Sequence, residues 1–444
     1  MMADLRSSVQ RYLLLFAMAQ AAVTAPACGA SSGAAGRPGG SVSSPGANAG
    51  DGGGGPASSA DAASGDAGAT QWVGTWTASP YPVPSGNMPP APLSQSVLRQ
   101  VVHVSLGGSQ VRLQFSNLSG NGPVTINSAH VAICRASPAV DGTIDPATDK
   151  ALSFSGAASV TVPQGQEIWS DPLDFTLPAL GNVSITVAFG DVPTVLTGHA
   201  GSRTTSYEQT GSTDVSAPSM ASAQAVVSWY YISAMEVMAG ASAKAIVAIG
   251  DSLTDGRGTD NNKNNRWTDD LEVRLQANAA TANVAMMNQA IGATTLVGTS
   301  GTAAQARFAR DVLGQSGVRY VIVFDGVNDI GGDATFDTMM PVYASLISQA
   351  HAHGLLIYGA TITPFGANAY YTPAHESVRQ QVNAYIKSGA FDGYFDFDAA
   401  VTDGGNPPSL QAQYDTWAQT DGLHLSPAGY QKLADTVDLT SFAR

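Results

Sequence analysis

The chain has 444 residues, enough for two or three domains of ordinary size. Only 12% of the residues are charged, and 20 Lys and Arg stand against 34 Asp and Glu, which gives a formal net charge of −14. This acidic balance argues against nucleic-acid binding and against docking on anionic lipid, because both need a basic face. Two cysteines and seven histidines without an HExxH pattern predict neither a disulfide framework nor a dedicated metal centre.

Residues 1–27 have the pattern of a secretory signal peptide. Arg6 and Arg11 supply the positive start before an apolar run from Tyr12 to Met18, and Ala25-Pro26-Ala27 supplies small residues for cleavage. The run is shorter than the roughly 20 apolar residues that span a bilayer. Cys28 follows directly, where a bacterial lipoprotein carries its lipid. Plain secretion and a lipid anchor on Cys28 both stay open, and both predict an extracytoplasmic protein.

Residues 28–70 are predicted to be a disordered tether. Of the 42 residues from 29 to 70, 35 are Gly, Ala, Ser or Pro. Such a segment buries too little apolar surface to offset the entropy of ordering it.

Residues 71–241 have the pattern of a β-rich accessory domain. Apolar and polar residues alternate in QVRLQFSN at 110–117, in NVSITVAF at 182–189 and around Ser159 to Val162, and Gly, Pro and Asn clusters separate these runs. Strands at this spacing predict an antiparallel, sandwich-like domain.

The pattern changes at residue 242. Continuous apolar runs cover residues 245–249, 318–324 and 355–362, a further strand is expected within 282–291, and helical patterns cover 267–276, 336–353 and 374–387. Apolar strands that alternate with helices predict a parallel sheet covered by helices on both faces. Ligands in such sheets bind at the carboxyl ends of the strands.

Chemically active residues follow these strands. The first strand runs into Gly250-Asp251-Ser252-Leu253, a later one into Gly326-Val327-Asn328-Asp329, and Asp421-Gly422-Leu423-His424 precedes the last helix. These three blocks, in this order, resemble the Ser, Asn and His blocks of the SGNH (GDSL) hydrolase superfamily. WVGTWTASP from Trp72, RWTDDLEVRL from Arg266 and RFARDVL from Arg307 resemble a bacterial GDSL esterase and lipase subgroup with an N-terminal β-rich region. The resemblance implies a three-layer, flavodoxin-like hydrolase domain over residues 242–444.

The residue types fit nucleophilic acyl transfer. Ser252 is the expected nucleophile, His424 the base that takes its proton, and Asp421 the acid that fixes the imidazole tautomer from three residues away. Taken singly, Ser252 is better explained as a helix cap, and Asp421 and His424 as parts of a surface turn. Taken together they favour a Ser-His-Asp triad, with Asp251 and Asp329 holding loops.

The resemblance also implies an oxyanion hole made by the Ser252 N–H, a backbone N–H of the second block and the Asn328 amide. The subgroup carries a pattern like NxGIxGN there, whereas this chain has Asn288-Gln289-Ala290-Ile291-Gly292-Ala293-Thr294. Position by position, the family's donor glycine falls on Ala293, and Gly292 is the alternative.

These features predict a secreted or lipoprotein serine esterase that hydrolyses carboxylic esters, with short-chain acyl groups, through an acyl-enzyme and without a cofactor. The expected partner is an ester substrate: an acylated carbohydrate, a short-chain lipid or a synthetic ester. The alternatives are a lipase or lysophospholipase-like acylhydrolase, and a carbohydrate-binding or deacetylating protein with the β domain as binding module.

Three further predictions concern single side chains. Leu253, Val327 and Leu423 line a substrate pocket or simply pack. His199 is an ordinary loop residue of the β half or approaches the cleft across the domain interface. Trp72, Trp76 and Trp169 stack on sugars or fill the sandwich core.

Overall fold

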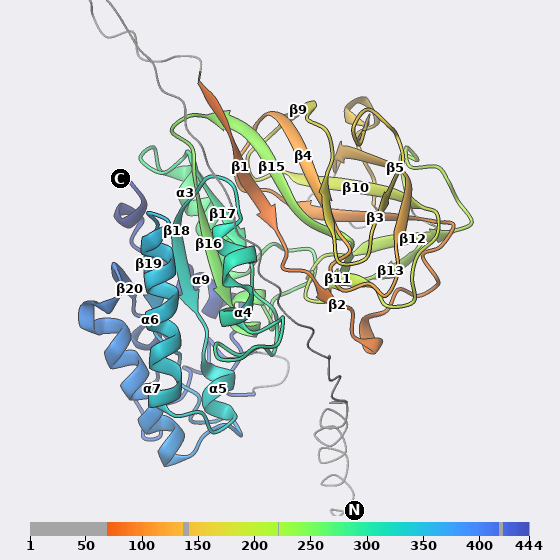
Figure 1. The fold of residues 1–444 in the computed structure, drawn as a ribbon. Coiled ribbons are helices and arrows are strands. Elements are labelled where there is room, and N and C mark those ends of the chain that lie inside the picture. The colour runs from red at the N-terminus through yellow and green to blue at the C-terminus, as the bar shows by residue number, and fades with distance from the viewer. Residues whose placement is uncertain (1–68, 136–141, 221, 417–420, 444) are drawn as a thin grey trace, which may run out of the picture. The chain divides into compact units, whose positions relative to one another are not determined.

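The computed structural model describes residues 69–135, 142–220, 222–416 and 421–443 (Figure 1). The predicted signal peptide, Cys28 and the predicted tether up to residue 68 lie outside these ranges. The first described strand, β1 (Thr70–Thr77), begins where the predicted tether ends. Within the described ranges, every helix is too short or too polar to cross a membrane.

The half before residue 242 consists of antiparallel strands, as the alternating patterns predict. Besides β1 its strands are β2 (Tyr81–Pro82), β3 (Ser96–His103), β4 (Gly108–Ser116), β5 (Val124–Ile133), β6 (Lys150–Ala151), β7 (Val160–Val162), β8 (Glu167–Trp169), β9 (Leu173–Leu177), β10 (Asn182–Phe189), β11 (Thr197–His199), β12 (Ser206–Thr210), β13 (Gln224–Val226), β14 (Trp229–Tyr230) and β15 (Ile232–Gly240). One sheet has the order β1-β15-β4-β8, with β9 also paired to β4, and a second has the order β13-β12-β3-β10-β5-β6, with β7 paired to β5. A small third sheet has the order β14-β11-β2.

Strand β10 shows why the period-two pattern is only part of the account. Its apolar residues, among them Ile185, face the shared core of the sheets. Its polar residues are buried as well, because the other face is covered by loops. Thr186 there accepts a hydrogen bond from Arg99 Nε at 2.8 Å, and Arg99 also donates to the carbonyl of Ala217 at 2.7 Å. An alternating strand can therefore be buried on both faces when its polar side chains find partners.

The half from residue 244 onward has a five-stranded parallel sheet with helices between its strands. Its strands are β16 (Lys244–Gly250), β17 (Val284–Asn288), β18 (Val318–Phe324), β19 (Leu356–Ala360) and β20 (Gly393–Phe395). Its helices are α2 (Ser252–Asp255), α3 (Trp267–Ala277), α4 (Ala304–Phe308), α5 (Val327–Gly331), α6 (Phe336–Ala352), α7 (Pro373–Tyr385), α8 (Phe397–Val401) and α9 (Pro427–Thr436). Strand β16 is buried almost throughout, as expected for a parallel strand covered on both faces.

The strand order β17-β16-β18-β19-β20 fixes where a ligand can bind. Strand β16 comes first in the chain, and its two neighbours are β17 and β18, so the strand order reverses beside it. In open α/β sheets the crevice at such a reversal, at the carboxyl ends of the strands, is the ligand site. The expected α/β class, with an antiparallel β-rich region before the hydrolase domain, is confirmed.

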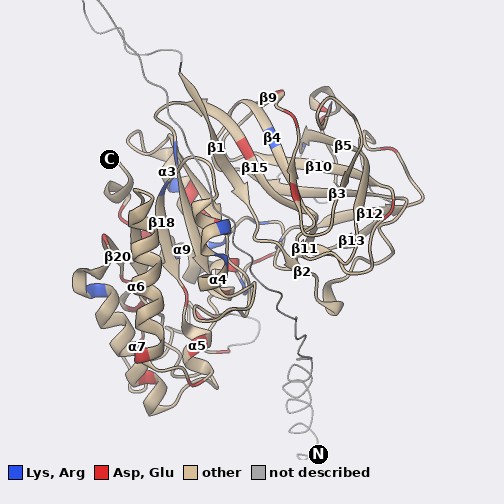
Figure 2. Ribbon diagram, in the orientation of Figure 1, with Lys and Arg blue, Asp and Glu red and all other residues tan. Residues whose placement is uncertain are grey.

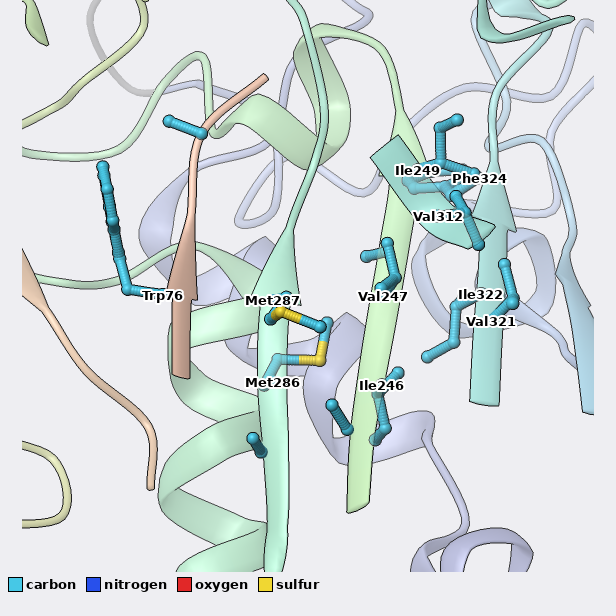
Figure 3. Packing of buried hydrophobic residues seen from close by; sticks show 14 of the residues in the cluster. Trp76, Ile246, Val247, Ile249, Met286, Met287, Val312, Val321, Ile322 and Phe324 are labelled. Carbon is cyan, nitrogen blue, oxygen red and sulfur yellow. The ribbon is translucent and has the colours of Figure 1, made fainter. Parts of the chain in front are cut away.

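The two halves share one apolar core (Figure 3). Trp76 of β1 lies on one side of Met286 and Met287 of β17, and the apolar residues of β16 and β18 lie on the other. The strands approach closely, since a Cβ on Gly74 would lie 2.2 Å from the Met287 sulfur. The Thr77 hydroxyl donates to the Asn288 carbonyl at 3.2 Å, and the Ser105 hydroxyl accepts from the Met286 N–H at 3.0 Å.

Candidate active site

Ser252 is the first residue of the short helix α2, directly after β16. Asp251 caps this helix, and its Oδ1 accepts a hydrogen bond from the Leu253 N–H at 2.9 Å. The strand must end on glycine here, because a Cβ on Gly250 would lie 2.3 Å from the Phe324 carbonyl oxygen. Ser252 is 7% exposed, so its hydroxyl lies just below the surface.

Three side chains from other elements fasten the backbone around the serine. Arg307 donates to the Gly250 carbonyl at 3.0 Å, and Asn288 Nδ2 donates to the Thr254 carbonyl at 2.7 Å. Arg266 Nε donates to the Asp255 carbonyl at 3.1 Å. A helix of one turn has little stability of its own, so these bonds set its position.

The structure brings Ser252, His424 and Asp421 together. Ser252 Oγ lies 2.8 Å from His424 Nε2, and His424 Nδ1 lies 2.7 Å from Asp421 Oδ2. Asp421 Oδ1 accepts from the N–H groups of Leu423 and His424, at 3.0 and 2.9 Å. These two backbone bonds explain how a spacing of three residues brings the carboxylate to its histidine: the chain turns back over Asp421 before α9 begins. The arrangement holds the tautomer in which Nε2 accepts a proton from the serine.

Burial and neighbouring charges shift the pKa values of His424 and Asp421 so that His424 can act as a base. Burial lowers the pKa of His424, Asp421 opposes that effect, and the charges of Arg257 and Arg203 add to it. Burial raises the pKa of Asp421, but the hydrogen bonds from the His424 ring, from the His424 N–H and from the Leu423 N–H outweigh it, so that pKa is lowered. Asp421 is therefore a carboxylate at neutral pH, and His424 is available as a neutral base.

Asn328 lies in the first turn of α5, and its amide is held from both ends. Its Nδ2 donates to the Thr294 carbonyl at 2.8 Å, and its Oδ1 accepts from the Tyr370 hydroxyl at 3.1 Å. Because Nδ2 has two hydrogens, one is left to donate to a substrate oxygen.

The second-block residues form a tight turn beside the nucleophile. The Thr294 N–H donates to the Ile291 carbonyl at 3.4 Å, and Ala293 has a φ of 61°. This left-handed position usually belongs to glycine, and here alanine adopts it. A Cβ on Gly292 would lie 3.9 Å from Ser252 Cβ, so this turn borders the serine, and the choice of Ala293 over Gly292 stays a prediction.

Buried aspartates support the loops rather than the chemistry. Asp329 accepts from the N–H groups of Leu296 and Val297, at 2.8 and 2.9 Å, and so fixes the loop after the Gly292–Ala293 turn. Burial raises the pKa of Asp251, and the charge of Asp329 adds to the rise. Both aspartates have the loop-holding geometry that we expected of them.

The other predicted residues lie as follows. Leu253, Val327 and Leu423 belong to the apolar core and are 1%, 1% and 5% exposed, so they pack, and a pocket-lining role stays a prediction. His199 reaches the hydrolase half: its Nε2 lies 2.8 Å from Asp255 Oδ1, and its Nδ1 lies 3.0 Å from the Ser79 carbonyl oxygen. His199 thus supports α2 through Asp255 rather than facing Ser252.

Two residues that support the site were not predicted from the sequence. Asp255, three residues after Ser252 on α2, connects the nucleophile helix to the β half through His199, and its spacing within GDSLTD was the available signal. Tyr370 orients Asn328 from a loop before α7, and nothing in the sequence around it marks this role. Over the described ranges, no cluster of three or more His, Cys, Asp or Glu side chains is arranged to hold a metal ion.

Comparison with known proteins points to the parallel-sheet half. Residues 248–432 match the model of the GDSL-like Lipase/Acylhydrolase family. No curated protein is significantly similar to the chain. Among solved structures, a lipolytic protein of the G-D-S-L family from Desulfitobacterium hafniense is 20% identical over 45% of this chain and 99% of its own, with a TM-score of 0.35. An acetyl-xylooligosaccharide esterase from Geobacillus is 20% identical over 44% of this chain and 91% of its own, also with a TM-score of 0.35.

Proposed function

We propose, from the match of residues 248–432 to the GDSL-like Lipase/Acylhydrolase family, that the protein is a serine esterase that hydrolyses carboxylic esters. The observation that carries the proposal is the continuous hydrogen-bonded series Ser252–His424–Asp421, with distances of 2.8 and 2.7 Å. A serine hydroxyl is a weak nucleophile unless an adjacent base takes its proton, and the series supplies that base and the acid that orients it.

The reaction would proceed in two steps. His424 Nε2 takes the proton of Ser252 Oγ while that oxygen attacks the ester carbonyl carbon, and the imidazolium then gives the proton to the departing alcohol. In the second step His424 removes a proton from water, the hydroxide oxygen attacks the acyl-enzyme, and the acid and free Ser252 are released. Asp421 stabilises the imidazolium in both steps.

The oxyanion of each tetrahedral intermediate would be held by three donors: the Ser252 N–H, the Ala293 N–H and the Asn328 amide. Among the described residues, neither of these two N–H groups donates to another group of the chain, so both are available to a ligand. Preorganised donors of this kind typically contribute about 10²–10³ in rate each.

Short acyl chains fit the surroundings of the nucleophile better than long ones. Leu253, Val327 and Leu423 are the apolar side chains nearest to the catalytic blocks in sequence, and all three are committed to the core. A long-chain lipase would need exposed apolar surface there to hold its substrate, so the lipase and lysophospholipase alternative ranks second.

The contacts of the tryptophans count against the alternative in which the β half binds carbohydrate. The Arg112 guanidinium lies 4.7 Å from the ring centroids of both Trp72 and Trp169, and Trp76 packs edge-on against Trp229 at 5.0 Å. Indole rings that already contact an arginine or another ring are less available for sugar stacking. We therefore propose that the β half supports the hydrolase rather than binding substrate by itself. The extracytoplasmic location, with or without a lipid on Cys28, is proposed from the sequence alone.

Hydrolysis of p-nitrophenyl esters of increasing acyl length tests the proposal. Residues 69–444 should hydrolyse acetyl and butyryl esters fastest, and Ser252→Ala should lose that activity while keeping its circular dichroism spectrum. A maximum at long chains would favour the lipase alternative. A folded protein without activity on any ester, or a Ser252→Ala variant with unchanged rate, would refute the assignment.

A further inference from the structure

Two arginines approach the catalytic histidine from opposite halves of the protein. Arg203 belongs to the loop between β11 and β12 of the β half, and Arg257 directly follows Gly256, the C-cap of α2. Both guanidinium groups lie close enough to lower the pKa of His424 electrostatically. Arg203 also acts in this way on Asp255 and on Tyr430.

The backbones of both arginines are fixed. The Arg257 N–H donates to the Ser252 carbonyl at 2.9 Å, and its own carbonyl accepts from the Tyr430 hydroxyl at 2.6 Å. Arg203 has a φ of 50°, and its carbonyl accepts from the Asn262 N–H at 2.8 Å. A left-handed conformation is costly for a residue with a side chain, and it recurs where function requires a particular direction.

The guanidinium groups, by contrast, lack partners. Over the described residues, neither forms an ion pair or a hydrogen bond, and Arg203 Nε is buried without any hydrogen-bond partner. Other arginines of this half are engaged: Arg307 bonds Asp311, and Arg379 bonds Glu376 and Asp398. Cations are sparse along the chain (Figure 2), and they are outnumbered by acids, 20 to 34. Two guanidinium groups that lack a partner among the described residues, near one histidine, are therefore candidates for binding a ligand.

The acidic groups near the pair bond to histidines rather than to the arginines. Asp255 is bonded to His199 at 2.8 Å, and Asp421 is bonded to His424 at 2.7 Å. Burial raises the pKa of Asp415, a further carboxyl group near His424. The two guanidinium groups are thus left without an acidic partner among the described residues, near the catalytic base of a protein that is acidic overall. Their positive charge attracts an anion, and guanidinium groups bind carboxylate and phosphate oxygens through paired hydrogen bonds.

We propose that Arg203 and Arg257 form an anion subsite for a carboxylate or phosphate group on the alcohol part of the ester. The placement follows from the chemistry of the histidine, since His424 protonates the departing alcohol and that part of the substrate must lie on its side of the site. The inference rests on the proposed esterase function and adds a substrate class to it: acyl esters of alcohols that carry an oxyanion. The subsite spans both halves, so the β half supplies substrate specificity through Arg203.

A kinetic comparison tests the subsite. The substrates are 3-acetoxybenzoate, 3-acetoxyphenyl phosphate and 3-acetoxybenzamide, which share the acetyl group and differ in the charge of the alcohol part. The wild type should show kcat/KM about tenfold or more higher for an anionic ester than for the amide, and Arg203→Gln and Arg257→Gln should each reduce this ratio several-fold. The larger ratio of the two anionic esters identifies carboxylate or phosphate as the preferred group.

Arg319→Gln is the matched control, because Arg319 is exposed at the start of β18, the end of the sheet opposite to Ser252. It removes the same charge and should leave the ratio unchanged. A wild-type ratio near one, or a ratio that falls equally in Arg319→Gln, overturns the subsite while leaving the esterase intact.

Binding to Ser252→Ala decides the matter without catalysis. By calorimetry, 3-acetoxybenzoate or the phosphate should bind at least several-fold tighter than 3-acetoxybenzamide, and the double variant Arg203→Gln/Arg257→Gln in the same background should lose the difference. Higher ionic strength should weaken anion binding as well, because the groups are partly exposed. Equal binding of charged and neutral esters overturns the proposal, even if the chain proves to be no esterase at all.

Discussion

Replacing His199 by alanine should damage both stability and catalysis, although the residue lies outside the triad. Its two ring nitrogens face the Asp255 carboxylate at 2.8 Å and the Ser79 carbonyl oxygen at 3.0 Å. Both partners are hydrogen-bond acceptors, and only a ring with a hydrogen on each nitrogen can donate to both at once. It forms a buried ion pair with Asp255, whose side chain is 6% exposed while that of His199 is 4% exposed.

The magnitude follows from what is left behind. Removing one partner of a buried pair leaves an uncompensated charge and typically costs about 3–5 kcal/mol. Burial raises the pKa of Asp255, but the charge and hydrogen bond of His199, with Arg203 and Arg266, outweigh it and lower that pKa. In the wild type this pair therefore adds stability above the pKa of the unfolded aspartate, and that stability is lost as the pH falls through the lower folded value.

In His199→Ala the effect of burial prevails, so the pKa of Asp255 rises and its ionisation destabilises the protein at neutral pH. The stability difference between variant and wild type should therefore be largest near pH 7 and shrink as the pH approaches 4. Because Asp255 lies on α2 with Ser252, kcat should fall about 10–100-fold as well, the size of effect that a small displacement of a nucleophile produces.

Urea unfolding at several pH values and p-nitrophenyl acetate hydrolysis measure the two effects. His199→Gln keeps a donor toward Asp255 and should recover part of both losses. His351→Ala is the control, since it removes a histidine that pairs with Asp392 at 2.9 Å on the surface, where such pairs contribute about 0–1 kcal/mol. If His199→Ala loses less than about 1 kcal/mol and keeps its kcat, α2 is not held from the β half.

Three further predictions concern the active site itself. Asp421→Asn should lower kcat by about 10²–10⁴, less than Ser252→Ala does, because an amide does not hold the His424 tautomer; an unchanged kcat removes Asp421 from the triad. Since the pKa of His424 lies below the ordinary 6.5 and the base must be neutral, the fall of kcat/KM for a neutral ester should have its midpoint below pH 6.5. A fall centred above pH 6.5 would contradict the burial of the imidazole. Ala293→Gly relieves a left-handed alanine at the price of a more flexible unfolded chain, so the free energy of unfolding should stay level or rise by up to about 1 kcal/mol in urea titrations; a clear loss would show that the Ala293 methyl group makes a stabilising contact.

The elements of the hydrolase half were readable from the sequence because each strand is a continuous apolar run. The run 318–324 is strand β18, and the patterns at 336–353 and 267–276 are α6 and α3 to within a residue at either end. The carboxyl ends of parallel strands share one edge, so Ser252 and Asn328 could be placed together before any coordinates. The Asp421–His424 contact was readable as well, because it is local.

What the sequence could not show lies in contacts between distant segments. The contact between Tyr370 and Asn328 joins residues 42 positions apart, and that between His199 and Asp255 joins residues 56 positions apart. The three segments that resemble the bacterial subgroup could be recognised in the sequence, but their structural role could not. In the structure each makes a contact between the two halves: Ser79 of the first donates to Asp311 of the third at 2.6 Å, and Arg266 of the second donates to the Ser202 carbonyl at 2.6 Å. These motifs join the two halves, which no period along the chain records.

The contact between β1 and β17 provides a test of how tightly the two halves pack. A methyl group on Gly74 would lie 2.2 Å from the Met287 sulfur, and Met287 is fully buried, so Gly74→Ala should overpack the contact between β1 and β17 and cost about 1–3 kcal/mol. Met287→Ala alone should cost about 2–5 kcal/mol, because it leaves a cavity. In the double variant the new methyl group occupies part of that cavity, so urea unfolding should show a loss at least about 1 kcal/mol smaller than the sum of the single losses. Additive losses would mean that β1 and β17 do not meet at these two residues, and the shared core of the two halves would have to be drawn differently.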